Sequence, residues 1–124
     1  METKSRLITI APVLPTSDLA RDIAWYKEKT GFDLHFSHDS YAVLHRVNLY
    51  IHLQWHANTQ NDPLLGGSVI RFFIDGIRSL FDEFVKRGAV GSDKFRADTS
   101  WGTNEFGFHD LNNNAIFIVE DIKD

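Results

Sequence analysis

Two amphipathic segments, each ended by a glycine and set between strand-like stretches, constrain the fold of this chain more than any other feature. The first runs from Leu19 to Gly31 and the second from Ile77 to Gly88, with apolar residues at helical spacing. A glycine in this place is typical of a helix C-terminus. Because strands precede and follow each predicted helix, the sequence indicates a strand–helix–strand order twice, with a right-handed crossover in each half.

The remaining apolar runs are short and read as strands. They cover residues 7–14, 33–38, 41–46, 49–55, 68–74, 105–109 and 115–120. In the stretch 49–55, odd-numbered residues such as Ile51 and Leu53 should pack on a helix, whereas Tyr50, His52 and Gln54 should face a wetter space. Pro12 cannot donate to a sheet ladder, which predicts that the first strand lies at an edge or changes partner there. The segment 89–103 has no clear period.

The length of 124 residues suits one domain. We predict an α+β fold of two βαβββ modules, one over about 7–56 and one over about 68–121, within a single domain spanning residues 1–124. The polar stretch 57–67, with a Gly pair at its end, is the predicted linker.

Composition excludes several classes of function. The net charge of −4 and the absence of a basic run argue against nucleic-acid binding. No apolar run approaches the ~20 residues needed to span a bilayer, and no secretory leader is visible, so a cytoplasmic protein is expected. The sequence has no cysteine, which excludes disulfides and thiolate chemistry. An aromatic content of 13% predicts a bulky core or a ring-lined cavity.

Three short segments carry a resemblance to a known family. They are Ala11–Leu14, Phe73–Ile77, and Trp101-Gly102 ahead of Glu105-Phe106, the last followed by an Asn-rich turn at 112–114. The chain resembles the vicinal oxygen chelate superfamily, the glyoxalase/bleomycin resistance/dioxygenase group, and within it the bleomycin resistance proteins. The resemblance implies two βαβββ modules that form a curved mixed sheet around a cup.

Metal-dependent members of that superfamily draw ligands from four strand positions. Mapped by motif, these positions hold Ala11, His52, Ser68 or Val69, and Phe117. Only His52 is a good ligand, whereas a catalytic metal needs at least three protein donors in most cases. The resemblance therefore implies no metal and no other cofactor. No nucleophile elbow, P-loop or dinucleotide motif is present, so we assign no catalytic residues.

The bleomycin resistance branch also lacks those ligands, and it implies non-enzymatic binding and sequestration of a small molecule such as a bleomycin-type glycopeptide. It further implies a homodimer that exchanges its N-terminal strand near Pro12. The candidate ligand-binding residues are Trp101, His52, Tyr41, Trp55, Gly102, Glu105, His35 and Phe117. Trp101 is either a stacking platform or a plug for the cup, and Glu105 contacts either a ligand cation or a salt-bridge partner on the sheet.

One position departs from the family pattern. Family members tend to carry carboxylates just after the Gly-Phe that ends the first helix, which suits a cationic drug, but His35 stands in place of an acid here. Two alternatives to sequestration stay open. One is a metal-dependent glyoxalase, thiol-transferase or dioxygenase of the same fold, and the other is a structural or regulatory partner domain.

Overall fold

The computed structural model describes residues 4–123, so both ends of the predicted 1–124 domain lie outside the described part. Its elements follow the order β-α-β-β-β-β-α-β-β. They are β1 (Val13–Thr16), α1 (Leu19–Thr30), β2 (Asp33–His38), β3 (Tyr41–Arg46), β4 (Leu49–Trp55), β5 (Val69–Phe73), α2 (Ile77–Arg87), β6 (Thr103–His109) and β7 (Ala115–Asp121). The predicted α+β class is confirmed.

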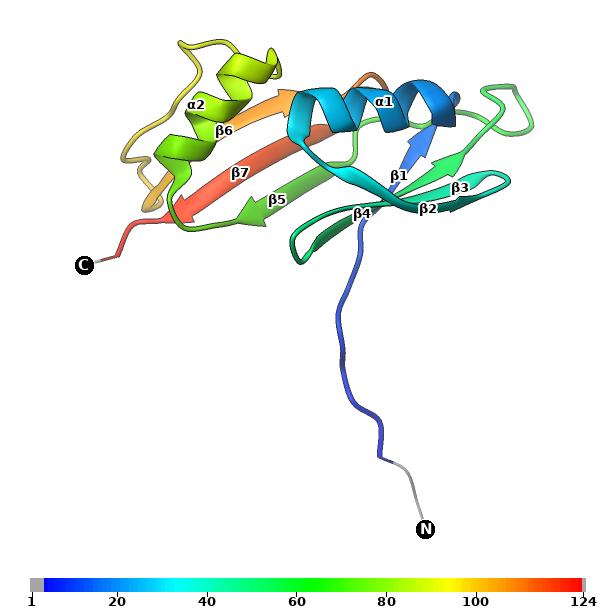
Figure 1. Cartoon of the computed structure of the whole chain (residues 1–124), viewed down its shortest axis with the longest axis horizontal. Helices are drawn as coiled ribbons and strands as arrows, with labels where there is room; N and C mark the ends of the chain where they lie inside the picture. The colour runs from blue at the N-terminus through cyan, green and yellow to red at the C-terminus, as the bar shows by residue number, and fades with distance from the viewer. Residues whose placement is uncertain (1–3, 124) are drawn as a thin grey trace.

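The strands form two sheets rather than one continuous sheet. The first sheet has the order β1-β4-β3-β2, and the second has the order β5-β7-β6. In each sheet the strand that precedes the helix pairs in parallel with the last strand of its module. Figure 1 shows both helices on one side of the two sheets. We call the opposite side the outer face.

Local sequence explains where the helices begin and end. The Asp18 side chain accepts a hydrogen bond from the Arg21 amide at 3.1 Å and caps α1. Gly31 ends this helix with a φ of 74°, a left-handed conformation that favours glycine. At the start of α2 the Glu120 carboxylate accepts a hydrogen bond from the Gly76 amide at 2.5 Å. Neither described helix has the length and apolar character that crossing a bilayer requires.

The first strand was predicted over residues 7–14, and its predicted start is wrong. β1 starts at Val13, and Figure 1 shows residues 4–12 extending away from the sheets on the side opposite to the helices. Leu7, Ile8 and Ile10 are therefore almost fully exposed. The apolar run that indicated a strand is present, but the partner that would complete the strand is not found within the described chain.

The second module also differs from the expected βαβββ pattern. Between α2 and β6, the position that β2 occupies in the first module is reduced to one isolated bridge between Arg96 and Glu105. The irregular sequence over 89–102 explains this, because it offers no alternation for a strand to bury.

A single apolar core joins the two modules. It includes Leu14 and Leu53 of the first module and Phe84, Phe106 and Ile118 of the second. The predicted faces of β4 are confirmed: Ile51 and Leu53 are fully buried beneath the helices, and Gln54 is exposed on the outer face.

Buried polar groups also join the modules. The Asp22 carboxylate on α1 accepts hydrogen bonds from Thr16 and from the Asn112 side chain in the β6–β7 turn. The Tyr26 hydroxyl donates to Asp110 at 2.6 Å, and burial beside that carboxylate raises the pKa of Tyr26. Since both carboxylates and their donors are paired, this network fixes how α1 sits against the second module.

Candidate functional site

The outer face carries most of the predicted site residues. Strand alternation on β4 places His52 there, and the register of β3 and β4 sets it close to Tyr41. The Tyr41 hydroxyl lies 2.8 Å from His52 Nδ1, and the two rings meet edge to face. His35 lies near them on β2, where its ring contacts His45 and Tyr50 edge to face. The first sheet therefore offers a ring-rich, histidine-rich surface.

A second group of predicted residues lies on the outer face of the other sheet. Gly102 has a φ of 85°, and the turn it forms sets Trp101 next to β6. The Trp101 indole nitrogen donates to Glu105 at 3.1 Å, while the residue as a whole remains 55% exposed. Phe117 on β7 packs over Gly107, where a side chain would collide with the ring. This arrangement favours the platform interpretation of Trp101, because the ring faces solvent instead of closing a cavity.

Glu105 is the most constrained charge on this face. It is almost completely buried, and its carboxylate accepts hydrogen bonds from Thr103 at 2.7 Å, Trp101 at 3.1 Å and Arg71 at 3.2 Å. Burial alone would raise the pKa of Glu105, but these donors outweigh it and the pKa is lowered. Glu105 is thus ionised and fully partnered, which matches the salt-bridge interpretation.

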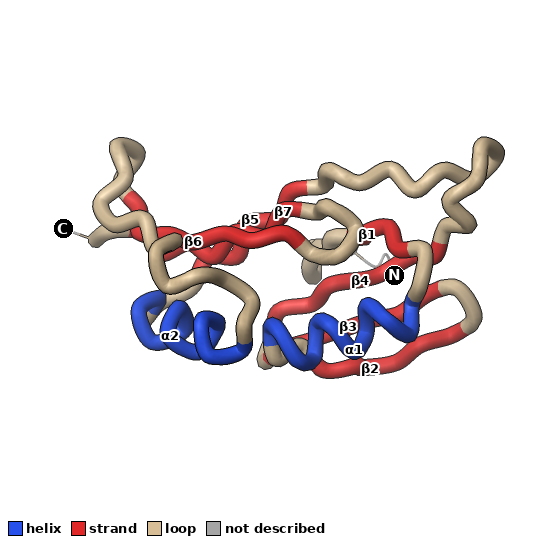
Figure 2. The backbone as a smooth tube through the Cα atoms, turned by 90° about the horizontal axis from the view of Figure 1, so that it is seen from above, coloured by secondary structure: helices blue, strands red, loops and turns tan. Residues whose placement is uncertain are grey.

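A cavity of about 810 Å³ lies beside the first group, and of the eight predicted site residues only His52 is among its walls. It opens between β4 and β5, its walls include His52 and Arg71, and residues 9–12 form one side. The His52 amide donates to the Pro12 carbonyl at 2.9 Å, so the N-terminal segment is held to β4 up to that point. Figure 2 shows the two sheets lying side by side with the helices along them.

Trp55 lies apart from the other predicted residues. Alternation puts it on the helix side of β4 with Leu53, and its indole nitrogen donates to the Ser17 carbonyl at 3.1 Å. It therefore borders the beginning of α1 instead of the outer face.

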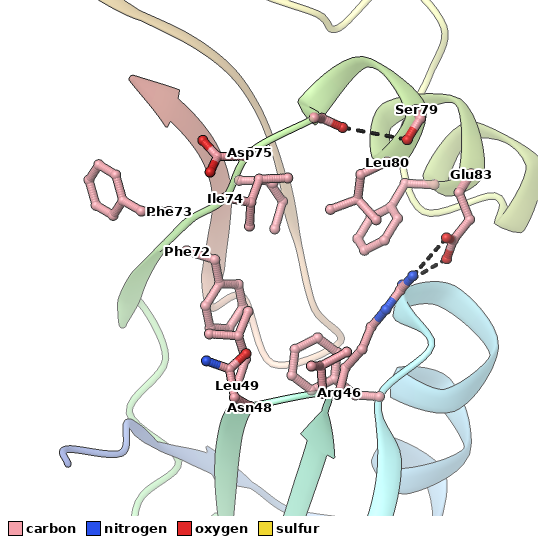
Figure 3. A pocket seen from close by; sticks show the side chains of 15 residues that line it. Arg46, Asn48, Leu49, Phe72, Phe73, Ile74, Asp75, Ser79, Leu80 and Glu83 are labelled. Carbon is pink, nitrogen blue, oxygen red and sulfur yellow. Dashed lines mark hydrogen bonds and ion pairs between the residues drawn. The ribbon is translucent and has the colours of Figure 1, made fainter. Parts of the chain in front are cut away.

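A separate cavity of about 460 Å³ lies at the junction of the modules (Figure 3). Its walls include Phe72, Leu49 and Leu80, and the ion pair between Arg46 and Glu83 closes one side. None of the eight predicted site residues lines it.

The residues at the four mapped metal positions do not fit a metal centre. Ala11, Val69 and Phe117 have no side-chain donor atoms, which leaves His52 and at most Ser68, fewer than the three protein donors that a catalytic metal needs in most cases. Among residues 4–123, no group of three or more His, Asp or Glu side chains is placed to hold an ion.

Sequence reasoning missed Arg71 and Arg96, which both contact the Trp101–Glu105 group. The Arg71 guanidinium lies over the Phe117 ring at 5.6 Å, and that of Arg96 lies over Trp101 at 5.1 Å. Alternation along β5 could have identified Arg71, because Val69, Arg71 and Phe73 share the exposed face. Arg96 lies in the aperiodic segment, where no sequence signal exists.

Comparison with known proteins agrees with this fold. No protein-family model matches the chain. A bleomycin resistance protein of Geobacillus stearothermophilus is 27% identical over 126 residues, covering 90% of this chain and 96% of that protein. A bleomycin-binding protein solved with bleomycin superposes with a TM-score of 0.74 at 19% identity, covering 93% of this chain and 99% of the other.

A second solved structure identifies the class of fold. A glyoxalase/bleomycin resistance protein/dioxygenase from Nocardioides superposes with a TM-score of 0.72 at 19% identity, over 98% of this chain and 87% of that one. The chain thus has the fold of the vicinal oxygen chelate superfamily. Within this class, its sequence is similar to the bleomycin resistance proteins along almost their whole length.

Proposed function

We propose that the protein binds and sequesters a bleomycin-type glycopeptide antibiotic and does not alter it. The observation that carries the proposal is the similarity to bleomycin resistance proteins over 90% of this chain. The outer face supplies what sequestration requires: an exposed Trp101, the Tyr41–His52 pair and a cavity whose walls include His52 and Arg71. Binding without reaction needs only shape, aromatic surface and a few polar groups that orient the ligand.

We further propose that the protein acts as a homodimer. Apolar side chains are exposed on the outer face, among them Phe36, Val69 and Phe73, and the segment with Leu7 and Ile10 projects beyond it. Such a surface is typical of an interface. A second copy would cover it, with exchange of the segment hinged at Pro12, and would complete a ligand cleft between the two subunits. Capture of a drug ahead of its intracellular target would place the protein in the cytoplasm, which cell fractionation checks.

Isothermal calorimetry with bleomycin tests the binding proposal. We expect saturable heat and a raised melting temperature, and we expect Trp101→Ala to weaken binding about tenfold or more, since central aromatic contacts carry much of the binding energy. Leu111→Ala, at an exposed apolar residue in the β6–β7 turn, is the matched control and should bind normally. No heat and no thermal shift at millimolar drug would remove bleomycin as the ligand.

The metal-dependent alternative makes a separate prediction. A lyase, thiol transferase or dioxygenase of this fold would carry Zn, Mn, Ni or Fe after purification. Elemental analysis of the purified protein therefore distinguishes the alternative from sequestration.

A further inference from the structure

Two guanidinium groups flank Trp101 and Glu105 on the outer face of the second sheet. We call Arg71, Arg96, Trp101 and Glu105 the arginine–tryptophan cluster. Arg71 reaches Glu105 from β5 at 3.2 Å, and Arg96 approaches the same carboxylate from the loop at 3.9 Å. Two positive groups thus face one carboxylate, and the cluster carries a net positive charge.

The single carboxylate of the cluster is not available to a ligand. Glu105 is 1% exposed, and Thr103, Trp101 and Arg71 already donate to it. A ligand cation at this place would have to displace one of these donors and would meet two arginines. The cluster therefore disfavours a cationic ligand group beside Trp101.

The arginines, in contrast, are accessible to solvent. The Arg71 side chain is 37% exposed and that of Arg96 is 57% exposed. Within the described residues, the bond to Glu105 is the one hydrogen bond that the Arg71 side chain donates, although a guanidinium carries five N–H donors. The rings of Phe73 and Phe117 lie 5.9 and 5.6 Å from the Arg71 guanidinium carbon and hold it in place.

Other carboxylates on the outer face do not reverse this balance. Asp121 lies at the end of β7, where the register sets it opposite Thr103 at the sheet margin. On the first sheet, Asp33 is bound to Lys27 at 2.8 Å. Beyond Asp33 on β2, the place of an acid is taken by His35, whose ring contacts His45.

We propose that the outer face also takes a second class of ligand, planar aromatic molecules that stack on Trp101 and carry an anionic group of the carboxylate type, and that Arg71 determines this preference for an anion. The proposal rests on the proposed function, because it assumes that the outer face is the ligand-binding face. An oxyanion next to the stacked ring accepts charge-assisted hydrogen bonds from the unused donors of Arg71, a geometry that arginine forms better than lysine. Arg96 stacks on Trp101 and adds to the positive potential.

Three probes with the same ring separate charge from shape. They are 2-naphthoate, neutral 2-naphthylmethanol and 2-naphthylmethylammonium, each titrated calorimetrically into the full-length protein at low ionic strength. We expect 2-naphthoate to bind about tenfold more tightly than the ammonium probe. Arg71→Gln should remove most of this preference and should change the affinity for 2-naphthylmethanol much less than the affinity for 2-naphthoate. Arg71→Lys should keep part of the preference, since it retains the charge.

Arg78→Gln is the matched control. Arg78 also lies over an aromatic ring, 3.9 Å from the centroid of Phe95, but on the helix side. Its replacement should leave the preference intact. Equal or tighter binding of the ammonium probe by the unmodified protein would overturn the proposal even if Arg71→Gln failed to fold. An unchanged preference in folded Arg71→Gln would remove Arg71 as its cause.

Parallel titration with bleomycin separates this inference from the proposed function. Heat with bleomycin and none with 2-naphthoate would overturn the charge specificity and leave sequestration standing. No heat with any of the four compounds would overturn both.

Discussion

At the scale of single residues, the ion pairs of Glu83 show how one side chain can join several elements. Glu83 on α2 accepts hydrogen bonds at 2.7 Å from both terminal nitrogens of Arg46, and Arg87 donates to it as well. Arg46 also donates to the Thr30 carbonyl at the end of α1. One ion-pair group thus holds together β3 and both helices, and it closes the junction cavity of Figure 3.

The pH dependence of the free energy of unfolding should reveal the contribution of the Arg46–Glu83 ion pair. The hydrogen bond from Arg46 is the main cause that lowers the pKa of Glu83 to about 2, with burial opposing it. Because the folded pKa lies below that of an unfolded glutamate, about 4.3, the stabilisation is present above that value and is lost as the pH falls towards 2. Glu83→Gln should therefore flatten the fall in the free energy of unfolding across this window, measured by urea unfolding at several pH values.

Glu28→Gln is the control for that measurement. Glu28 is exposed on α1, and its carboxylate makes no hydrogen bond among residues 4–123. In Glu28→Gln, the acid-induced loss of stability should be the same as in the unmodified protein. An equally flattened curve in Glu28→Gln would show that the effect reflects net charge rather than the Arg46 contact.

The sequence predicts on which face of an element a residue lies where the two-residue alternation of a strand is regular. Alternation on β4 correctly separated His52 from Ile51, and it also placed Trp55 on the helix side, away from the cluster around Trp101. The bond between Tyr26 and Asp110 was not predictable, because 84 positions separate the two residues in sequence. Local patterns carry no information on such pairs before the modules are docked.

Elements were predictable where turn and cap residues bound them. The limits of β2, β3 and β4 follow from alternation and from the short turns between them, and Gly31 marks the end of α1. Two predicted strands are absent or shortened in the described chain, because a strand needs a partner with which to pair. An apolar run such as 7–10 forms a strand only beside a partner, and the aperiodic segment 89–102 cannot pair beyond the Arg96–Glu105 bridge.

The first turn of α1 allows a test at this scale. Asp18→Ala removes the side-chain acceptor of the Arg21 amide and should lower the free energy of unfolding by about 1 kcal/mol. Asp18→Asn retains an acceptor oxygen and should cost only a few tenths of that. Chemical denaturation of the three proteins gives the comparison, and equal losses in both variants would mean that charge, not capping, is what Asp18 contributes.

At the scale of the whole molecule, the exposed N-terminal segment should decide the oligomeric state. Leu7, Ile8 and Ile10 have no partner within the described chain. If a second copy supplies one, serine at all three positions should convert a dimer into a monomer in sedimentation velocity experiments. The loss of buried apolar area would drive the change.

Leu111→Ser serves as the matched change, because Leu111 is apolar and 49% exposed but lies in the β6–β7 turn. It should leave the sedimentation coefficient unchanged. If the unmodified protein sediments as a monomer at high concentration, the dimer proposal is contradicted. The fold of the single chain would not be affected by that result.

The connection over residues 57–67 has a practical consequence for protein engineering. Its hydrogen bonds largely stay local, as between Thr59 and Asp62, while the apolar core and the Asp22–Asn112 contact hold the modules against each other. The contacts that dock the two halves thus lie outside this loop. A backbone nick there, with each half fused to one fragment of a split reporter, offers a sensor in which a small molecule on the outer face shifts the reassembly of two polypeptides.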